Sequence, residues 1–201
     1  MPAVTAPAPI ATVAPPVPLK SAVEPPVSDT PTAPIPGSLP GDAVRAFEAP
    51  VRRSGPVSER FDSRTAKRTV VYVINSTTCS FCHDYIARLK DIEAKYMPRG
   101  VDVIHVYPNR SESDADKVAW HAKQGFRGGQ ILDAQATVAK LLEAEKTPTV
   151  YVVDRKGLIV YRGGVDDSPS GEAVTIHPLA DALDAILSGK SVEVSSFEAP
   201  G

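Results

Sequence analysis

The fold is decided by residues 69–82, Thr69-Val70-Val71-Tyr72-Val73-Ile74-Asn75-Ser76-Thr77-Thr78-Cys79-Ser80-Phe81-Cys82. The first half of this stretch, Thr69–Asn75, is a β-branched apolar run of the kind that fills the buried centre of a sheet. In residues 81–96, apolar side chains recur every three or four positions, which predicts an amphipathic helix. The two cysteines therefore lie where a buried strand leads into the first turn of a helix.

Further along the chain, hydrophobic periodicity and turn residues predict alternating strands and helices. They are strands at Val101–Tyr107 and Gln130–Leu132, helices at 111–123 and Ala134–Glu143, a β-hairpin of Thr149–Val153 and Leu158–Tyr161, and a helix from Pro178 to Gly189. The helix at 111–123 begins with Ser111-Glu112-Ser113-Asp114, which is a capping-box-like start. This order of elements implies an α/β fold, in which a mixed central sheet carries helices on both faces.

The first sixty residues differ in composition from the rest of the chain. Fourteen of the 20 prolines fall there, and residues 1–40 contain three charged side chains and no aromatic residue. Such a segment buries too little apolar surface to offset the entropy of ordering, so we predict a disordered Pro/Ala-rich tether of polyproline II character. The expected organisation is residues 1–60 as linker or tether, 61–190 as the folded domain and 191–201 as a C-terminal tail.

The charge balance excludes two classes of partner. Lys and Arg number 22 against 24 Asp and Glu, a net charge of −2, and no run of five or six like charges occurs. We therefore expect no nucleic-acid partner and no binding to an anionic membrane surface. No apolar stretch approaches the roughly 18 residues that a membrane-spanning helix needs, so no direct span is expected. As written, the N-terminus also lacks the basic and apolar regions of an export signal.

The two cysteines predict thiol-disulfide exchange. Unpaired backbone N–H groups and the positive end of the helix dipole stabilise a thiolate at the start of a helix. Cys79, the first and more exposed cysteine, is therefore the predicted nucleophile. Cys82 lies one turn later and is placed to attack the mixed disulfide that Cys79 forms, which releases the substrate. We predict Cys79 and Cys82 as the catalytic residues.

A Thr147-Pro148 pair stands directly before the predicted hairpin, about seventy residues after the cysteines. Together with the Cys-Ser-Phe-Cys motif at a strand–helix junction, this pair resembles the thioredoxin superfamily. Residues 147–163 look particularly like its redoxin branch, which includes thiol-disulfide oxidoreductases and alkyl-hydroperoxide-reductase-like domains. The resemblance covers about residues 60–190.

The resemblance implies a thioredoxin-like three-layer fold and a thiol-disulfide oxidoreductase that needs no cofactor. It also implies that the peptide bond before Pro148 is cis, that Pro148 faces the disulfide, and that the backbone of Thr147 pairs with an extended substrate. The implied partners are protein thiols or disulfides and a redox partner protein.

Three features depart from the pattern of that superfamily. Thr78 occupies the position of the familiar tryptophan before the first cysteine, and Ser80-Phe81 replaces Gly-Pro or Pro-Pro. The strand Val70–Ile74 contains no acid that could carry a proton when Cys82 resolves the mixed disulfide. We assign that proton transfer to water or to Asp84.

Two other functions would use the same cysteines. A peroxiredoxin-like peroxidase would attack a hydroperoxide with Cys79, but the usual proline and threonine, seven and three residues earlier, are Tyr72 and Ser76 here. The sequence Cys79-Ser80-Phe81-Cys82-His83 also matches the c-type haem attachment motif. That function would need His83 as an axial ligand and a mostly helical fold around the porphyrin. The predicted strands favour the redoxin.

The sequence fits a redoxin enzyme better than it fits a metal site or a non-catalytic module. One Cys-x-x-Cys with His83 supplies at most three neighbouring ligands, and the remaining histidines, His105, His121 and His177, are scattered. We therefore predict no metal. A non-catalytic thioredoxin-like interaction module generally lacks one or both thiols, so the retained pair favours an enzyme.

The place of action is predicted from the tether and from the resemblance. A spacer of roughly forty residues and the similarity to redoxins that are commonly exported predict a protein tethered in the periplasm or at the cell envelope. If Met1 is the true start of the chain, the lack of an export signal instead predicts a cytoplasmic protein.

Overall fold

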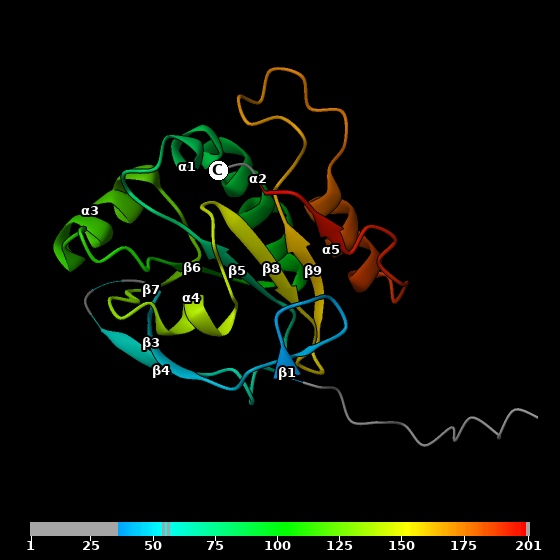
Figure 1. Ribbon diagram of the computed structural model, residues 1–201, viewed down its shortest axis with the longest axis horizontal. Coiled ribbons are helices and arrows are strands. Elements are labelled where there is room, and N and C mark those ends of the chain that lie inside the picture. The colour runs from blue at the N-terminus through cyan, green and yellow to red at the C-terminus, as the bar shows by residue number, and fades with distance from the viewer. Residues whose placement is uncertain (1–35, 54, 56, 200–201) are drawn as a thin grey trace, which may run out of the picture. The chain divides into compact units, whose positions relative to one another are not determined.

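The computed structural model describes residues 36–53, 55 and 57–199. Most of its strands belong to one sheet with the order β10-β9-β8-β5-β6-β7-β3-β4 (Figure 1). Their bounds are β3 Glu48–Arg52, β4 Ser58–Asp62, β5 Val70–Ile74, β6 Asp102–Val106, β7 Gly129–Ile131, β8 Thr149–Val153, β9 Ile159–Gly163 and β10 Ser196–Phe197. Two shorter strands, β1 Pro36–Gly37 and β2 Ala43–Val44, form a separate parallel pair.

The predicted central strand is confirmed. β5 pairs in parallel with β6 and antiparallel with β8, so the sheet is mixed, and all five of its residues are buried. Because side chains alternate along a strand, Val71 and Val73 enter one core while Tyr72 and Ile74 enter the other. β5 therefore joins two hydrophobic cores, one on each face of the sheet.

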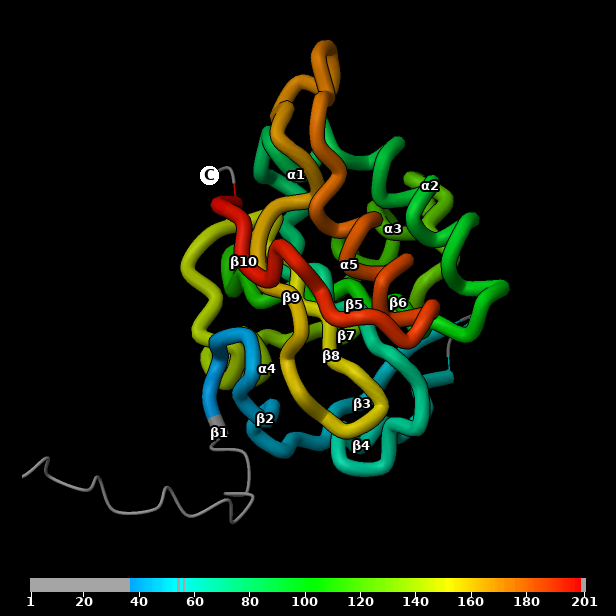
Figure 2. Tube along the Cα trace, turned by 90° about the vertical axis from the view of Figure 1, so that its right-hand side faces the viewer, coloured from blue at the N-terminus to red at the C-terminus, as the bar shows by residue number. Residues whose placement is uncertain are grey.

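Helices cover both faces of the sheet, which gives three layers. They are α1 Ser80–Asp84, α2 Ile86–Tyr96, the 3₁₀ turn η1 Met97–Arg99, α3 Asp114–Gln124, α4 Thr137–Leu141 and α5 Pro178–Leu187. Leu89 of α2 and Leu183 of α5 pack in the core of Val71 and Val73, whereas Val138 of α4 packs in the core of Tyr72. Figure 2 shows α2 and α5 on one side of the sheet and α4 on the other. The predicted thioredoxin-like architecture is thus confirmed.

The helix predicted over 81–96 is two helices in the structure. Tyr85 separates α1 from α2, with φ −88° and ψ −1°, and its backbone N–H donates to the carbonyl oxygens of Phe81 and His83. Its side chain is fully buried, as the three- and four-residue spacing indicated. The periodicity located the buried face correctly but did not reveal the break in the backbone.

The expected start of the folded domain at residue 61 is wrong. β3 and β4 pair along their whole length, and Phe47 and Val51 are buried in the core that contains Tyr72. In β3, exposed and buried residues alternate, which is a strand pattern that the high proline content of this region obscured. Pro50 is compatible with this strand because β3 pairs with β7 only at Arg52.

The expected C-terminal tail at 191–201 also differs from the structure. Ser196 and Phe197 form β10, which lies parallel to the end of β9 and so adds a strand to the edge of the sheet. Gly163 permits this close approach, since a Cβ there would lie 2.0 Å from the carbonyl oxygen of Phe197. The C-terminal segment is therefore part of the fold, next to the last hairpin.

The tether is predicted to be disordered. Residues 1–35 of it lie outside the described residues. Among the residues that are described, no helix is both long enough and apolar enough to cross a membrane.

Candidate active site

The structure places the two cysteines at the start of α1. Cys79 is the residue before the helix, with φ −79° and ψ 121°, and is partly exposed, whereas Cys82 is completely buried. Both are free thiols. Burial, followed by the neighbouring Cys79, raises the pKa of the Cys82 thiol well above its ordinary value. Cys82 is therefore a protonated thiol near neutral pH, and Cys79 is the sulfur that a partner can reach.

Thr147 and Pro148 lie opposite the cysteines. The Thr147–Pro148 peptide bond is cis, which is the conformation implied by the resemblance. The Cys79 Sγ donates a hydrogen bond to the carbonyl oxygen of Thr147 at 3.2 Å. This meeting follows from the sheet, because Ile74 at the end of β5 pairs with Thr149 at the start of β8. The loops that carry Cys79 and Pro148 therefore lie at the same end of these two paired strands.

Asp84 does not join this cluster through a hydrogen bond. It is the last residue of α1 and is exposed, and its backbone oxygen accepts a hydrogen bond from Arg88 at 3.0 Å. Among the described residues, no hydrogen bond links its carboxylate to either sulfur. Its role in proton transfer stays a prediction.

Glu112 is a residue of the site that sequence analysis missed. This carboxylate is 7% exposed and accepts hydrogen bonds from three consecutive residues before Cys79. They are the Ser76 hydroxyl at 2.5 Å, the Thr77 backbone N–H at 3.1 Å and the Thr78 hydroxyl at 3.2 Å. Asn109 donates a further bond at 2.9 Å. One buried carboxylate thus fixes the loop that leads to the nucleophile.

The electrostatics of Glu112 follow from the same bonds. Burial acts to raise its pKa, but the hydrogen bonds from Ser76, Thr77 and Asn109 outweigh burial and leave the pKa below its ordinary value. The sequence assigned Glu112 to a helix cap, whereas the residue that caps α3 is Ser113, whose hydroxyl accepts from the Asp116 backbone N–H at 3.1 Å. Glu112 instead turns toward a loop 34 to 36 residues away.

His83 also contacts the loop at 76–78. Its Nε2 lies 2.7 Å from the carbonyl oxygen of Thr77, and its ring lies 5.6 Å from that of Trp120. His105 is buried beside Glu93, with 2.9 Å between Nε2 and Oε1, and His121 is buried beside Tyr107. No group of three or more metal-binding side chains occurs in the part of the chain that the structure describes.

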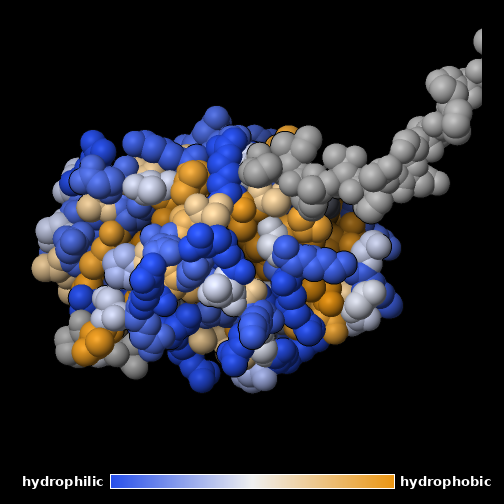
Figure 3. Space-filling view, turned by 90° about the horizontal axis from the view of Figure 1, so that it is seen from below, coloured by the Kyte–Doolittle hydropathy of each residue, from blue (hydrophilic) through white to orange (hydrophobic). Residues whose placement is uncertain are grey.

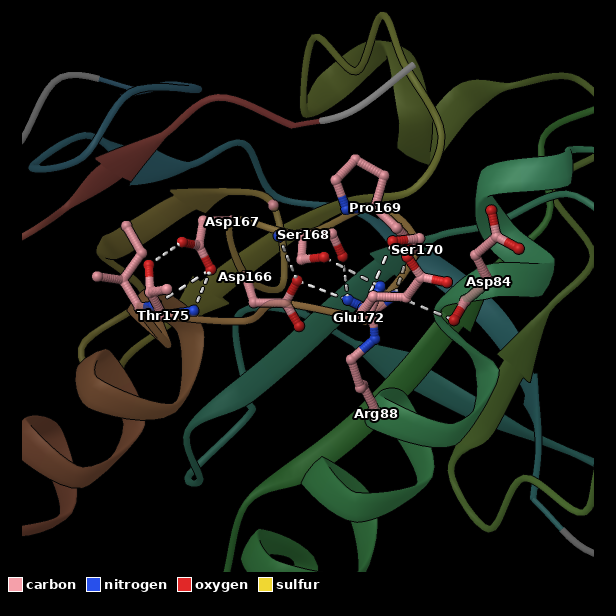
Figure 4. A network of polar contacts seen from close by, with 12 residues as sticks. Asp84, Arg88, Asp166, Asp167, Ser168, Pro169, Ser170, Glu172 and Thr175 are labelled. Atoms are coloured by element: carbon pink, nitrogen blue, oxygen red, sulfur yellow. Dashed lines mark hydrogen bonds and ion pairs between the residues drawn. The ribbon is translucent and has the colours of Figure 1, made fainter.

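Arg88 of α2 holds the loop that follows β9. Its guanidinium stacks on the Tyr85 ring at 3.8 Å and donates to the Asp166 carboxylate at 2.6 Å and to the Pro169 carbonyl at 2.8 Å. It also donates to the carbonyl of Ser168. Figure 4 shows these bonds converging on Arg88, with Asp84 on the neighbouring helix. Residues 164–177 are thereby anchored beside the helix that carries the cysteines.

A cavity of about 700 Å³ lies away from the two cysteines. It is lined by residues of the turn between β8 and β9, including Lys156 and Leu158, and by Ile186 and Val192. The turn is at the opposite end of β8 from Pro148, so this cavity is separate from the cysteines. Figure 3 shows the lower end of the molecule, where hydrophilic residues are interspersed with hydrophobic ones.

Solved structures with similar folds include several redox proteins. An uncharacterized conserved protein from Geobacillus kaustophilus has a TM-score of 0.71 at 24% identity, covering 82% of this chain and 89% of its own. A putative thiol:disulfide interchange protein DsbE from Chlorobium tepidum has a TM-score of 0.54 at 20% identity, covering 62% and 85%. Peroxidoxin BcpB from Mycobacterium tuberculosis has a TM-score of 0.57 at 17% identity, covering 76% and 98%.

At these identities the likeness establishes the fold alone. No curated protein matches the sequence. The sequence does match the family model described as "AhpC/TSA family", over residues 40–162, which is more than half of its length. The match spans both cysteines and the Thr147–Pro148 bond, so the site described above lies within the matched region. The chain belongs to the AhpC/TSA family.

Proposed function

We propose that this protein is a thiol-disulfide oxidoreductase that exchanges a Cys79–Cys82 disulfide or dithiol with partner proteins. The observation that carries the proposal is the contact at 3.2 Å between the Cys79 sulfur and the carbonyl oxygen of Thr147, next to Pro148. A partly exposed thiol that donates to the backbone carbonyl of Thr147, with a buried thiol one turn away, suits attack on an extended disulfide-containing segment.

The reaction in the reducing direction balances as two thiol-disulfide exchanges. The Cys79 thiolate attacks one sulfur of a partner disulfide, forms a mixed disulfide and releases the other partner sulfur as a thiolate, which takes up a proton. Cys82 then loses its proton, and its thiolate attacks the Cys79 sulfur. The second partner sulfur leaves as a thiolate and takes up a proton. The Cys79–Cys82 pair has then lost two electrons, and the partner disulfide has gained them. The oxidising direction is the reverse.

The different burial of the two cysteines supports the proposed order in which they attack. Because burial raises the pKa of Cys82, its thiol stays protonated while Cys79 makes the first attack. A base must accept its proton in the second step, and water and the exposed Asp84 are the proposed acceptors. Thr147, whose carbonyl faces Cys79, is the proposed backbone partner of the bound segment.

A peroxidase is the second candidate, because one of the solved structures similar to this chain is a peroxidoxin. The position three residues before Cys79, where peroxiredoxins usually have threonine, is Ser76. Its hydroxyl donates to Glu112 at 2.5 Å, so it is engaged with that carboxylate rather than free to orient a hydroperoxide. This contact favours disulfide exchange over peroxide reduction.

The test compares the two cysteine variants in two assays. Cys79→Ser is expected to abolish reduction of insulin disulfides, whereas Cys82→Ser is expected to accumulate mixed disulfides with the substrate. Consumption of hydrogen peroxide with a thiol reductant, measured in parallel, should be slow. Full insulin-reducing activity in both variants would overturn the proposal, and peroxide turnover faster than disulfide exchange would favour the peroxidase.

A further inference from the structure

A pocket of about 370 Å³ opens beside the proposed partner-binding loop. We name it the Lys146 pocket, and its walls come from four separate segments. They are Tyr85 between α1 and α2, Lys146 before the Thr147–Pro148 bond, Asp167 and Pro169 of the loop after β9, and Phe197 and Glu198 of the C-terminal segment. Because Lys146 precedes Thr147, the pocket begins one residue from the carbonyl that faces Cys79.

The pocket combines apolar walls with acidic groups. Pro169 and Phe197 provide the apolar surface, because the side chain of Tyr85, which also lines the pocket, is fully buried. Asp167 and Glu198 add two carboxylates. Asp166 also lines the pocket, but its carboxylate is paired with Arg88 at 2.6 Å. Asp167 and Glu198 are therefore the two carboxylates of the pocket that are not paired with an arginine.

Two groups in the pocket lack a close partner. The Tyr85 hydroxyl is buried and has no hydrogen-bond partner among the described residues. The Lys146 ammonium lies 3.6 Å from the Glu198 carboxylate, which is beyond a good hydrogen bond, and both side chains are exposed, by 42% and 90%. An ion pair with this geometry is weak and easily displaced.

We propose that the Lys146 pocket binds a lysine or arginine side chain of the partner protein, close in sequence to the cysteine that Cys79 attacks. This inference rests on the proposed function. Lysine and arginine have long apolar stems with charged ends, which matches apolar walls topped by carboxylates. The stem would lie between Phe197 and Pro169, and the charged end would reach Asp167 and Glu198, displacing the Lys146 ammonium.

The acidic side of the pocket is held in place before any partner arrives. The Asp167 carboxylate accepts hydrogen bonds from the backbone N–H groups of Thr175 and Ile176, at 2.9 and 3.1 Å, and from the Thr175 hydroxyl. These bonds lower the pKa of Asp167 to about 2, so it is charged at neutral pH. Figure 4 shows Asp167 and Thr175 on the left side of the network, Arg88 near its centre and Asp84 on the right.

The first experiment measures reduction of disulfide-linked peptides by the full chain. Each peptide contains one cysteine, and a lysine, glutamate or alanine stands one or two residues before or after it. We expect lysine in at least one position to raise kcat/KM over alanine by about two- to fivefold, the range of an exposed ion pair. Glutamate in that position should lower kcat/KM by a similar factor, and added salt should reduce both effects.

Variants of the charged residues of the pocket locate the effect. Glu198→Gln and Asp167→Asn are expected to reduce the preference for lysine, whereas Lys146→Gln, which removes the competing ammonium, should increase it. Glu193→Gln is the matched control, because Glu193 is an exposed carboxylate of the same C-terminal segment but lines a different cavity, against α5. An equal rate for lysine and glutamate at every position, or the same loss in Glu193→Gln, would overturn the inference.

A binding measurement separates this inference from the proposed function. Cys79→Ser protein is titrated with peptides in which serine replaces the cysteine, so no exchange occurs. Tighter binding of the lysine peptide that depends on Glu198 would support the pocket even if the wild-type protein reduced no disulfide. Equal binding of the lysine and glutamate peptides would overturn the pocket and leave the exchange reaction unaffected.

Discussion

Two charged side chains, Glu112 and Arg88, hold the two loops that flank the cysteines, and they do so in different environments. Glu112 is 7% exposed and binds the loop at 76–78, directly before the nucleophile. The Arg88 side chain is 18% exposed and binds the loop after β9 through carbonyl oxygens and the Asp166 carboxylate. The first is a buried anion that receives hydrogen bonds, and the second is a partly exposed cation that donates them.

This difference matches the tasks of the two loops. The loop at 76–78 must keep the Cys79 sulfur facing Thr147, and hydrogen bonds to a buried charge are strong and directional. The loop after β9 forms one wall of the Lys146 pocket and meets solvent, where a planar guanidinium stacked on Tyr85 can hold several carbonyl groups at once. We infer that Glu112 sets the geometry of the nucleophile and that Arg88 sets the shape of the surface offered to partners.

The largest expected effect comes from removing Glu112. Glu112→Ala leaves the Ser76 hydroxyl, the Thr77 N–H and the Asn109 amide without their acceptor, and each unsatisfied buried group costs about 1–3 kcal/mol. Because water can enter the space, we expect a loss of about 2–4 kcal/mol in the free energy of unfolding, measured in urea. The rate at which iodoacetamide alkylates Cys79 should also change, since its loop is released.

Glu112→Gln is the matched control for that variant. The amide keeps one acceptor oxygen and the shape of the side chain, so stability should fall less than in Glu112→Ala. If Glu112→Ala destabilised the protein but left both Cys79 alkylation and insulin reduction unchanged, Glu112 would be a structural residue with no effect on the nucleophile.

A smaller effect is expected from Arg88→Ala. This variant leaves the Asp166 carboxylate, 3% exposed, without its cation, although the Ser168 backbone N–H still donates to it at 3.1 Å. We expect a loss of about 1–3 kcal/mol in unfolding free energy, because the guanidinium is partly exposed and its bonds are partly replaced by water. Hydrogen exchange should accelerate in residues 166–176, with Cys79 alkylation unchanged.

Arg88→Lys sharpens the comparison. Lysine keeps the positive charge beside Asp166 but cannot bind several carbonyl oxygens in one plane or stack in the same way on Tyr85. Intermediate stability with fast exchange in the loop would show that the guanidinium geometry, and not its charge alone, orders this loop. Wild-type exchange in Arg88→Lys would contradict that interpretation.

The two flanking loops also show how far the sequence alone could predict the site. Cys79 and Cys82 could be predicted from their place between a buried strand and an amphipathic helix, and Thr147 and Pro148 from the resemblance to the thioredoxin superfamily. The pairing of β5 with β8 brings the two pairs together. The role of Glu112 could not be predicted, because its partners lie 34 to 36 residues away and its own neighbours resemble a helix cap. A long-range polar contact leaves no periodicity in the sequence.

The domain boundary was missed for a different reason. Composition averaged over 1–60 is dominated by proline, whereas Phe47, Ala49 and Val51 follow the alternation of a half-buried strand. A single strand of five residues contributes little to such an average. The alternation of apolar and polar residues within the proline-rich segment would have placed the start of the fold before Glu48.

The smallest expected effect is a difference in the acid sensitivity of the two loops. The pKa of Glu112 is lower in the folded chain than in the unfolded one, because hydrogen bonds from Ser76, Thr77 and Asn109 outweigh burial. The unfolded chain therefore binds the proton at a higher pH than the folded chain does. The stability that Glu112 contributes is fully present above its unfolded pKa, near 4.5, and is lost as the pH falls through the folded value.

Wild type and Glu112→Gln should consequently differ most near neutral pH, where the carboxylate is charged and the amide is not. Their unfolding free energies should converge as the pH is lowered below about 4.5, because a protonated carboxyl and an amide present similar neutral groups to the loop. Urea denaturation of both proteins between pH 7 and pH 3 measures this directly. A difference in unfolding free energy that stayed constant over that range would mean that Glu112 acts through its shape alone. The contrast drawn above between a buried anion and a partly exposed cation would then not rest on the charge of Glu112.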